Sequence, residues 1–297
     1  MISFAFSAAI PSVPSGPGRP RPPARNWRPV AVAAVVATAL LAGGALAPAQ
    51  AQIGSTTPVR IGVVGPFTGP SADFGVPMLN GIKLAVDEIN AVGGYLGRPL
   101  ELVIKDDTAD PDQGRKVSQE LLNEKVVATI GFCNTGVALK AIDLFQGASS
   151  PLIVPCATGT AVTAKYPAPD SYIFRVQARD AIQAPFLVDD IVKRGWDKVA
   201  IFADKTGYGE GGYNDVVAAL AAKNLKPVHV ARFDLGVKDL TAELTAARNA
   251  GANVVYSYTV GPENATIANG KKALGWKVPQ VGPWPLSFPF FLEGAKD

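Results

Sequence analysis

Histidine and cysteine are scarce in this 297-residue sequence, and their scarcity excludes several classes of protein. One His and two Cys are too few for a zinc site of the usual ligand count. The single His229 lies inside a predicted strand and no G-x-S-x-G motif is present, so a Ser-His-Asp hydrolase has no general base. The loop after the first predicted strand lacks the G-x-G-x-x-G spacing, and no G-x-x-x-x-G-K-[ST] occurs. We therefore expect no enzyme, no metal and no cofactor.

Charge is also sparse, at 18% of residues, and the net charge of +3 comes from one end of the chain. The first 51 residues hold four arginines and no Asp or Glu, and without them the formal net charge is −1. Nucleic-acid binding needs clustered Lys and Arg that displace the counterions of the phosphates. We therefore expect no nucleic-acid partner.

The first 51 residues have the pattern of a secretory signal peptide. An apolar run over residues 30–47 leads to the small-residue sequence Ala49-Gln50-Ala51, after which we expect cleavage. A membrane anchor is the alternative, because 18 apolar residues approach the length that spans a bilayer. The leader is favoured because Gly43 and Gly44 interrupt the run. The sequence thus predicts a periplasmic protein.

Short β-branched runs alternate with helical patterns from residue 58 onward, which favours an α/β fold with parallel sheets. We expect residues 52–175 to form an N-terminal α/β lobe and residues 176–297 a C-terminal one. The strands expected in the first lobe are residues 59–64, 100–104, 126–130 and 152–154, with an extended stretch at 172–176. Those of the second are 199–202, 227–232 and 254–258. The last residues complete no further unit, so the second lobe is expected to be incomplete.

Ligands of open parallel sheets bind beyond the carboxyl ends of the strands. Two of these ends, residues 132–136 and 155–160, carry hydroxyl groups and free N–H groups at the start of a helix, which suits a carboxylate. Ordinary helix capping is the alternative, and it is favoured when these residues are considered alone. Phe74 follows the first predicted strand, Tyr208 follows the strand that begins at Val199, and Trp284 lies near the end of the chain. These aromatic residues suit an apolar ligand body, although scattered aromatic residues more often belong to a core.

The two cysteines, Cys133 and Cys156, follow consecutive predicted strands. If those strands pair in parallel, their ends are neighbours, and in an oxidising compartment the thiols can form a disulfide. Two small buried thiols are the alternative. The sequence leaves both open.

Several ordered motifs together resemble the Leu/Ile/Val-binding family of substrate-binding proteins, which serve ABC uptake systems and have the type I periplasmic-binding fold. The likeness covers about residues 58–290. It implies two Rossmann-like lobes that are joined by a hinge and close on a small solute without catalysis. The motifs are residues 61–69, residues 85–94, Asp106-Asp107 with Asp110-Pro111, Phe174-Arg175, and Asp204 followed by Tyr208-Gly209.

The resemblance also implies roles for individual residues. Thr135 with Gly136, and Thr158 with the backbone of Cys156 and Ala157, would hold the carboxylate of the ligand. Phe74 and Tyr208 would line the cleft from opposite lobes.

Trp284 departs from the family pattern. It follows Gly282-Pro283, where the amino-acid binders of the family place an acidic residue for the ammonium group of the ligand. Asp204 and Glu263 are candidates to compensate. Without compensation, we expect a carboxylate ligand with an apolar or aromatic body, and a branched-chain amino acid as the second choice.

The function expected from this resemblance is a monomeric carrier that delivers its ligand to a membrane permease and its ATPase. Family members usually continue further and pass back through the hinge, so we expect the chain to be truncated at its C-terminal end. A ligand-sensing protein that serves a signalling partner is the alternative function.

Overall fold

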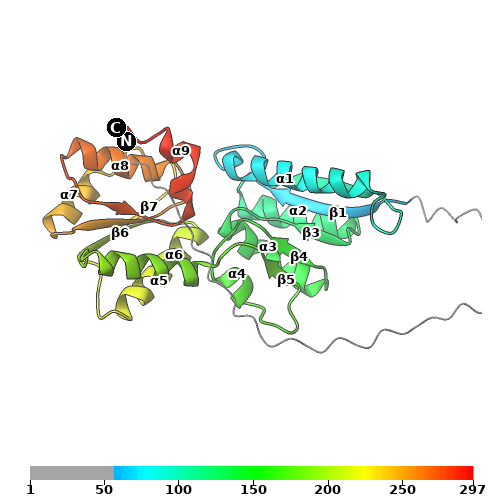
Figure 1. Ribbon diagram of the computed structural model, residues 1–297, viewed down its shortest axis with the longest axis horizontal. Coiled ribbons are helices and arrows are strands. Elements are labelled where there is room, and N and C mark those ends of the chain that lie inside the picture. Colours follow the sequence, from blue (N-terminus) through cyan, green and yellow to red (C-terminus); the bar gives the residue numbers. More distant parts are fainter. Residues whose placement is uncertain (1–56, 297) are drawn as a thin grey trace, which may run out of the picture. The chain divides into compact units, whose positions relative to one another are not determined.

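The computed structural model describes residues 57–296, which form an α/β structure with two parallel sheets (Figure 1). The predicted signal peptide, residues 1–51, lies outside the described residues. Within residues 57–296, no helix has both the length and the hydropathy needed to cross a membrane.

The first sheet has the strand order β2-β1-β3-β4-β5, with every pair parallel. Val63 in the central strand pairs with Ile104 on one side and Ile130 on the other. The strands are β1 (Val59–Gly65), β2 (Leu100–Asp106), β3 (Ala128–Ile130), β4 (Leu152–Val154) and β5 (Ile173–Arg175).

Helices cover the two faces of this sheet differently. One face packs against α2 (Pro111–Asn123) and α3 (Thr135–Gly147) in a closed core that includes Leu121, Phe145 and Leu152, all fully buried. Helix α2 begins as the sequence predicts, because Asp110 accepts a hydrogen bond from Gln113 N at 2.7 Å and Pro111 occupies the first turn. The four-residue helix α4 (Ala161–Ala164) follows β4.

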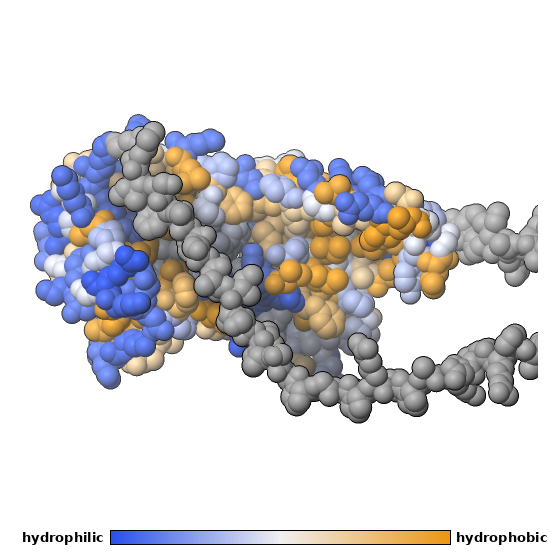
Figure 2. All heavy atoms as spheres, viewed as in Figure 1, coloured by the Kyte–Doolittle hydropathy of each residue, from blue (hydrophilic) through white to orange (hydrophobic). Residues whose placement is uncertain are grey.

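The other face of the first sheet meets α1 (Ala72–Ala91) across an open groove of about 680 Å³. Ile61 and Ile130 of the sheet and Ile82 and Val86 of α1 line this groove. Large apolar side chains of α1 and β2, such as Leu84 and Ile104, are exposed. Figure 2 shows apolar residues gathered over the part of the molecule where Figure 1 places α1 and β1.

The second sheet has the order β7-β6-β8-β9, again all parallel, and its central strands β6 and β8 are buried along their whole length. Buried apolar clusters lie on both of its faces. The strands are β6 (Val199–Asp204), β7 (His229–Phe233), β8 (Val254–Tyr258) and β9 (Gln280–Val281). The helices are α5 (Asp180–Lys193), α6 (Gly207–Ala221), α7 (Thr241–Asn249), α8 (Glu263–Ala273), the 3₁₀ helix η1 (Trp284–Ser287) and α9 (Pro289–Leu292).

The predicted fold class is confirmed, since the described residues form two α/β lobes with parallel sheets. Strand β8 has the predicted bounds, and β1 and β6 continue by one and two residues beyond theirs. The last strand of the first sheet ends at Arg175 and the next strand along the chain belongs to the second sheet. The division at residues 175 and 176 stays a prediction.

Candidate functional site

The first helical turns of α3 and α6 meet at two glycines. A Cβ atom added to Gly207 would lie 2.9 Å from the Cα atom of Gly136, closer than real Cβ contacts allow. Only glycine permits this approach at position 207, whereas a Cβ atom at Gly136 would lie 3.4 Å from Gly207 N, an ordinary contact. The meeting point brings the strand-end loops of both sheets together.

A pocket of about 300 Å³ lies beside this contact. Three helix N-termini border it, those of α2, α3 and α6. No Asp or Glu is among its lining residues, and Lys205 is among them. The lining residues are Ser71, Ala109, Pro111, Asn134, Thr135, Gly136, Val137, Lys205, Thr206, Gly207, Tyr208, Leu235 and Val260.

The three N-termini differ in how they are capped. Asp110 caps α2, and the hydroxyl of Thr206 accepts hydrogen bonds from Tyr208 N at 3.2 Å and Gly209 N at 3.5 Å to cap α6. Asn134, at the start of α3, makes no capping bond, and its Nδ2 donates instead to Ser71 Oγ at 3.2 Å. The N-terminus of α3 therefore keeps its partial positive charge for an anion in the pocket.

Aromatic side chains gather next to this pocket, at one end of the groove under α1. The ring centroid of Phe74 lies 5.1 Å from that of Trp284 and 4.6 Å from that of Phe288. Trp284 Nε1 donates a hydrogen bond to Thr158 Oγ1 at 3.4 Å. Phe74, Cys156, Trp284 and Phe288 all line the groove. This end of the groove offers an apolar surface beside a hydroxyl group.

The loop of residues 157–160 is held from two sides. The guanidinium of Arg175 donates to the carbonyl oxygens of Ala157 at 3.3 Å and Gly159 at 2.9 Å. Gly159 N donates to Thr135 Oγ1 at 3.2 Å, which leaves the hydroxyl proton of Thr135 available for another acceptor. Thr160 accepts from Ala181 N at 2.8 Å and donates to Asp215 at 2.7 Å, which ties this loop to α5 and α6.

The eight predicted ligand residues fall into three places. Thr135, Gly136 and Tyr208 line the 300 Å³ pocket. Phe74, Cys156 and Trp284 line the groove. Ala157 and Thr158 line neither, and each is 1% exposed.

Both cysteine thiols are free, with Cys133 buried and Cys156 half-buried. The Cys133–Cys156 disulfide stays a prediction.

Asp180 was missed by the sequence analysis, which gave it no role. It begins α5, is fully buried, and interacts with the hydroxyls of Thr158 and Tyr258. Burial raises the pKa of Asp180 to about 6, and these two hydroxyls reduce the increase. An acidic residue in the first turn of a helix is visible in the sequence, but its burial beneath Thr158 is not.

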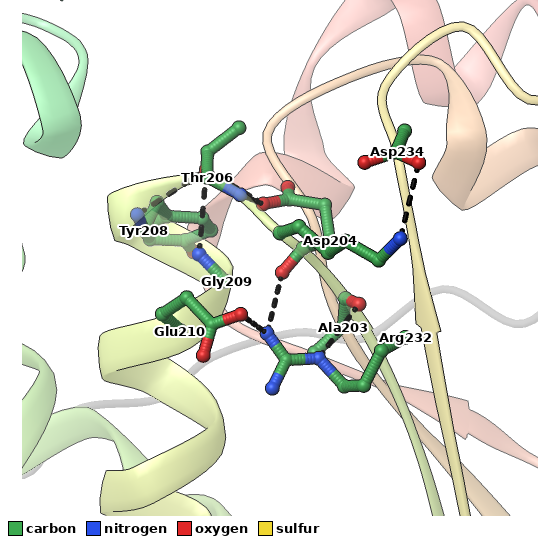
Figure 3. Close-up of polar contacts among 9 residues, drawn as sticks. Ala203, Asp204, Thr206, Tyr208, Gly209, Glu210, Arg232 and Asp234 are labelled. Atoms are coloured by element: carbon green, nitrogen blue, oxygen red, sulfur yellow. Dashed lines mark hydrogen bonds and ion pairs between the residues drawn. The ribbon is translucent and has the colours of Figure 1, made fainter.

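Neither Asp204 nor Glu263, the compensating acids considered from the sequence, lines the pocket or the groove. Asp204 Oδ1 accepts from Thr206 N at 2.9 Å and Thr206 Oγ1 at 2.6 Å (Figure 3). Its Oδ2 accepts from Val260 N at 3.0 Å. Glu263 is 2% exposed and accepts from Gly236 N at 2.6 Å. Both carboxylates hold loops in place.

Arg232 of β7 stabilises the carboxyl end of the neighbouring strand β6. It donates to the backbone oxygens of Ala203 and Asp204 and pairs with Glu210, while Lys205 pairs with Asp234 (Figure 3).

A G-x-G-x-x-G pattern at Gly207, Gly209 and Gly212 was also missed, because only the loop after the first strand was tested for this spacing. The pattern follows β6 and opens α6. Added Cβ atoms would lie 2.1 Å from Asp204 O at Gly209 and 2.0 Å from the ring of Tyr258 at Gly212. These glycines permit close packing, and Thr206 already caps the helix, so the pattern does not form a phosphate loop here.

The family model of the periplasmic binding proteins matches residues 58–291. The chain belongs to this family. This periplasmic binding protein is 34% identical to Leu/Ile/Val-binding protein homolog 3 of Brucella melitensis over 67% of its own length and 53% of the relative's.

Two solved structures resemble it as well. One is an ABC transporter solute binding protein of R. palustris in complex with 4-hydroxybenzoate, at 25% identity and a TM-score of 0.68, which covers 75% of this chain and 61% of that one. The other is the branched-chain amino acid transporter substrate binding protein LivJ of Streptococcus pneumoniae in complex with isoleucine, at 26% identity and a TM-score of 0.68, which covers 76% and 64%. This periplasmic binding protein thus spans less than two thirds of the length of each of these three relatives.

Proposed function

We propose that this protein is the extracytoplasmic solute-binding component of an ABC uptake system. It binds a small ligand that has a carboxylate and an apolar or aromatic body, in the cleft between its two lobes. Ligand binding closes the hinge, and the closed form delivers the ligand to a permease and its ATPase. The protein acts in the periplasm, as a monomer and without catalysis.

The observation that carries this proposal is the uncapped N-terminus of α3 in a pocket whose lining has no acidic side chain. An anionic group gains there from the helix dipole and from free N–H donors. The hydroxyl of Thr135 adds a donor at the same place, because its oxygen already accepts from Gly159 N. A carboxylate is the common anionic group of small metabolites that fits a pocket of this size.

The aromatic end of the groove supports the choice of an acid without an ammonium group. Trp284, Phe74 and Phe288 offer flat apolar surfaces for the ligand body. An α-amino acid also carries an ammonium group, which needs a carboxylate partner when it is removed from water. Neither the pocket nor the groove has an Asp or Glu among its lining residues. An acid without an ammonium group is therefore the first choice.

The relatives support both choices. The structure from R. palustris holds 4-hydroxybenzoate, an aromatic acid, and the one from Streptococcus pneumoniae holds isoleucine. The relative from Brucella melitensis is named for leucine, isoleucine and valine. A branched-chain amino acid therefore remains the second choice.

Isothermal titration with a matched set of ligands tests the proposal. 4-Methylpentanoate has the body and carboxylate of leucine without the ammonium group, and 4-methylpentanamide lacks the carboxylate as well. We expect 4-methylpentanoate or 4-hydroxybenzoate to bind at least ~10-fold more tightly than leucine, and the amide to bind ~100-fold more weakly than the acid. Tighter binding of leucine than of every acid without an ammonium group would contradict the proposed ligand class.

A further inference from the structure

Cys133 and Cys156 follow the ends of two neighbouring strands. Strands β3 and β4 pair in parallel with Ile130 opposite Ile153, and Cys133 and Cys156 follow the last residues of these strands by three and two residues. The pairing continues past the strands, because Gly131 N donates to Ile153 O at 3.0 Å and Ala157 N donates to Phe132 O at 2.9 Å. The second of these bonds places Phe132 opposite Cys156, so Cys133 lies one residue further along the neighbouring chain. Strands about 5 Å apart with a rise of about 3.3 Å per residue then put the two cysteine Cα atoms about 6 Å apart, which lies in the range that a disulfide spans.

The two thiols interact with each other, and a third sulfur lies beside them. Burial raises the pKa of Cys133, and the neighbouring thiol of Cys156 contributes to the increase. The Sγ atom of Cys133 also lies 3.7 Å from Met78 Sδ of α1. Cys133 is 6% exposed, whereas Cys156 lines the groove under α1 and is half-buried. A reagent in the groove therefore reaches Cys156 first.

These cysteines belong to the two loops that the proposed function uses. Cys133 stands directly before Asn134 and the uncapped first turn of α3, and Cys156 stands directly before Ala157 and Thr158. A covalent bond between them would join the start of α3 to the loop that Arg175 holds. It would thereby fix the position of the donors proposed for the ligand carboxylate.

We propose that Cys133 and Cys156 are a reversible dithiol–disulfide pair whose oxidation locks the two anion-binding loops together and tightens ligand binding. The effect on ligand binding rests on the proposed function, whereas the thiol chemistry does not. Tighter binding follows because loops fixed before binding lose less conformational freedom when the ligand arrives.

The oxidant is a small-molecule or protein disulfide, and the reaction has two steps. The thiolate of Cys156 attacks one sulfur of the oxidant, which leaves a mixed disulfide on Cys156 and releases one thiol. The thiolate of Cys133 then attacks the Cys156 sulfur and releases the second thiol. Two protons leave the cysteines and two electrons pass to the oxidant. Burial, together with the neighbouring Cys156, raises the pKa of Cys133, so its thiolate is scarce and this second, intramolecular step is the slower one.

The test treats the folded, reduced protein with oxidised glutathione and then measures intact mass and thiol content after unfolding. We expect two thiols before treatment and none after it, a monomer lighter by two hydrogens, and a melting midpoint raised by ~5 °C. Cys133→Ser should retain a glutathione adduct on Cys156, because the resolving thiol is missing. Cys156→Ser should keep its remaining thiol, that of Cys133, unmodified, because this thiol is buried. Met78→Leu serves as the control and should oxidise as the unmodified protein does.

Three results would contradict the proposal that Cys133 and Cys156 form a disulfide with each other. They are thiols that react only after unfolding, disulfides between chains, and thiols that become reactive only after a chelator is added. The last result would indicate a metal site. The ligand arm compares 4-methylpentanoate binding in the two redox states, with ~5-fold tighter binding expected when oxidised. Equal affinities would overturn the locking role. Loss of all ligand binding in both states would contradict the proposed function and leave the thiol result standing.

Discussion

Trp284 and Thr158 lie 126 residues apart in the sequence, and the indole Nε1 of the first donates to the hydroxyl oxygen of the second at 3.4 Å. The same hydroxyl interacts with the carboxyl group of Asp180, which burial keeps at a pKa of about 6. Thr158 thus connects an aromatic surface of the groove to a buried acid at the start of α5. Substitutions of Trp284 and Thr158, the two ends of this hydrogen bond, test what each contributes to ligand binding.

Trp284→Glu should change the preferred ligand. A carboxylate at this position supplies the partner that an ammonium group needs, and it removes an aromatic face from the ligand body. We expect leucine binding to strengthen by at least ~10-fold relative to 4-methylpentanoate, as measured by titration calorimetry. Trp284→Phe is the control, because it keeps an aromatic ring and should leave the order of ligands unchanged. An unchanged order in Trp284→Glu would remove Trp284 from the set of residues that select the ligand.

Thr158→Val should weaken binding of the preferred acid by about 5- to 10-fold, which corresponds to the loss of one hydrogen bond of about 1 kcal/mol. The valine side chain keeps the shape of threonine but neither accepts from Trp284 nor donates to Asp180. Thr158→Ser restores the hydroxyl and should restore the affinity. If serine and valine bind the ligand equally well, the hydroxyl has no part in binding.

Gly207→Ala should reduce ligand affinity by holding α3 and α6 apart. The added methyl group would lie 2.9 Å from Gly136 Cα, which is backbone and cannot move aside as a side chain can. Gly211→Ala in the same helix is the control, since nothing lies within 4 Å of its added Cβ and alanine favours the helix. We expect a loss of at least ~10-fold for the first variant and no loss for the second, measured by calorimetry. Equal affinities would show that close approach of the two helices is not needed.

Asp107→Asn should flatten the dependence of stability on pH. Asp107 is fully buried, burial raises its pKa to about 7, and the neighbouring Asp106 and Asp110 add to the increase. The ordinary pKa of an Asp side chain is 3.8, and in the folded protein that of Asp107 is about 7. Between these two pH values the folded state binds more protons than the unfolded state, so the stability of the protein falls as pH rises. The loss at pH 8 amounts to as much as about 4 kcal/mol.

The asparagine variant avoids this loss and keeps the oxygen that accepts from Ala109 N. Its melting midpoint should exceed that of the unmodified protein at pH 8 and match it near pH 4. Asp106→Asn is the contrasting variant. Burial raises the pKa of Asp106, but hydrogen bonds from Thr68 and from backbone N–H groups outweigh it, so the net shift is downward. Asp106→Asn should therefore lose stability at neutral pH. A gain in stability there would contradict the opposite pKa shifts given for Asp106 and Asp107.

Much of the fold was predictable because its signals are local. The run of residues 254–258 is β-branched and aromatic throughout, and its strand has the predicted bounds. The start of α2 was predictable because Asp110 and Pro111 act within one helical turn.

The site was only partly predictable. Thr135, Gly136 and Tyr208 line one pocket as strand-end residues should. Asp106 and Asp107, in contrast, are identical neighbours in the sequence, yet one is held by hydrogen bonds at the surface and the other is buried. The contact between Trp284 and Thr158 depends on tertiary packing across two lobes, for which the sequence has no local signal.

The meeting of Gly136 and Gly207 also bears on the rate of ligand exchange. Two surfaces without side chains have nothing to interlock, so separating them at this point needs no rotamer change. The proposed hinge opening instead breaks hydrogen bonds between the lobes, among them the one from Thr160 to Asp215. We therefore expect the glycine contact to add little to the time that opening needs.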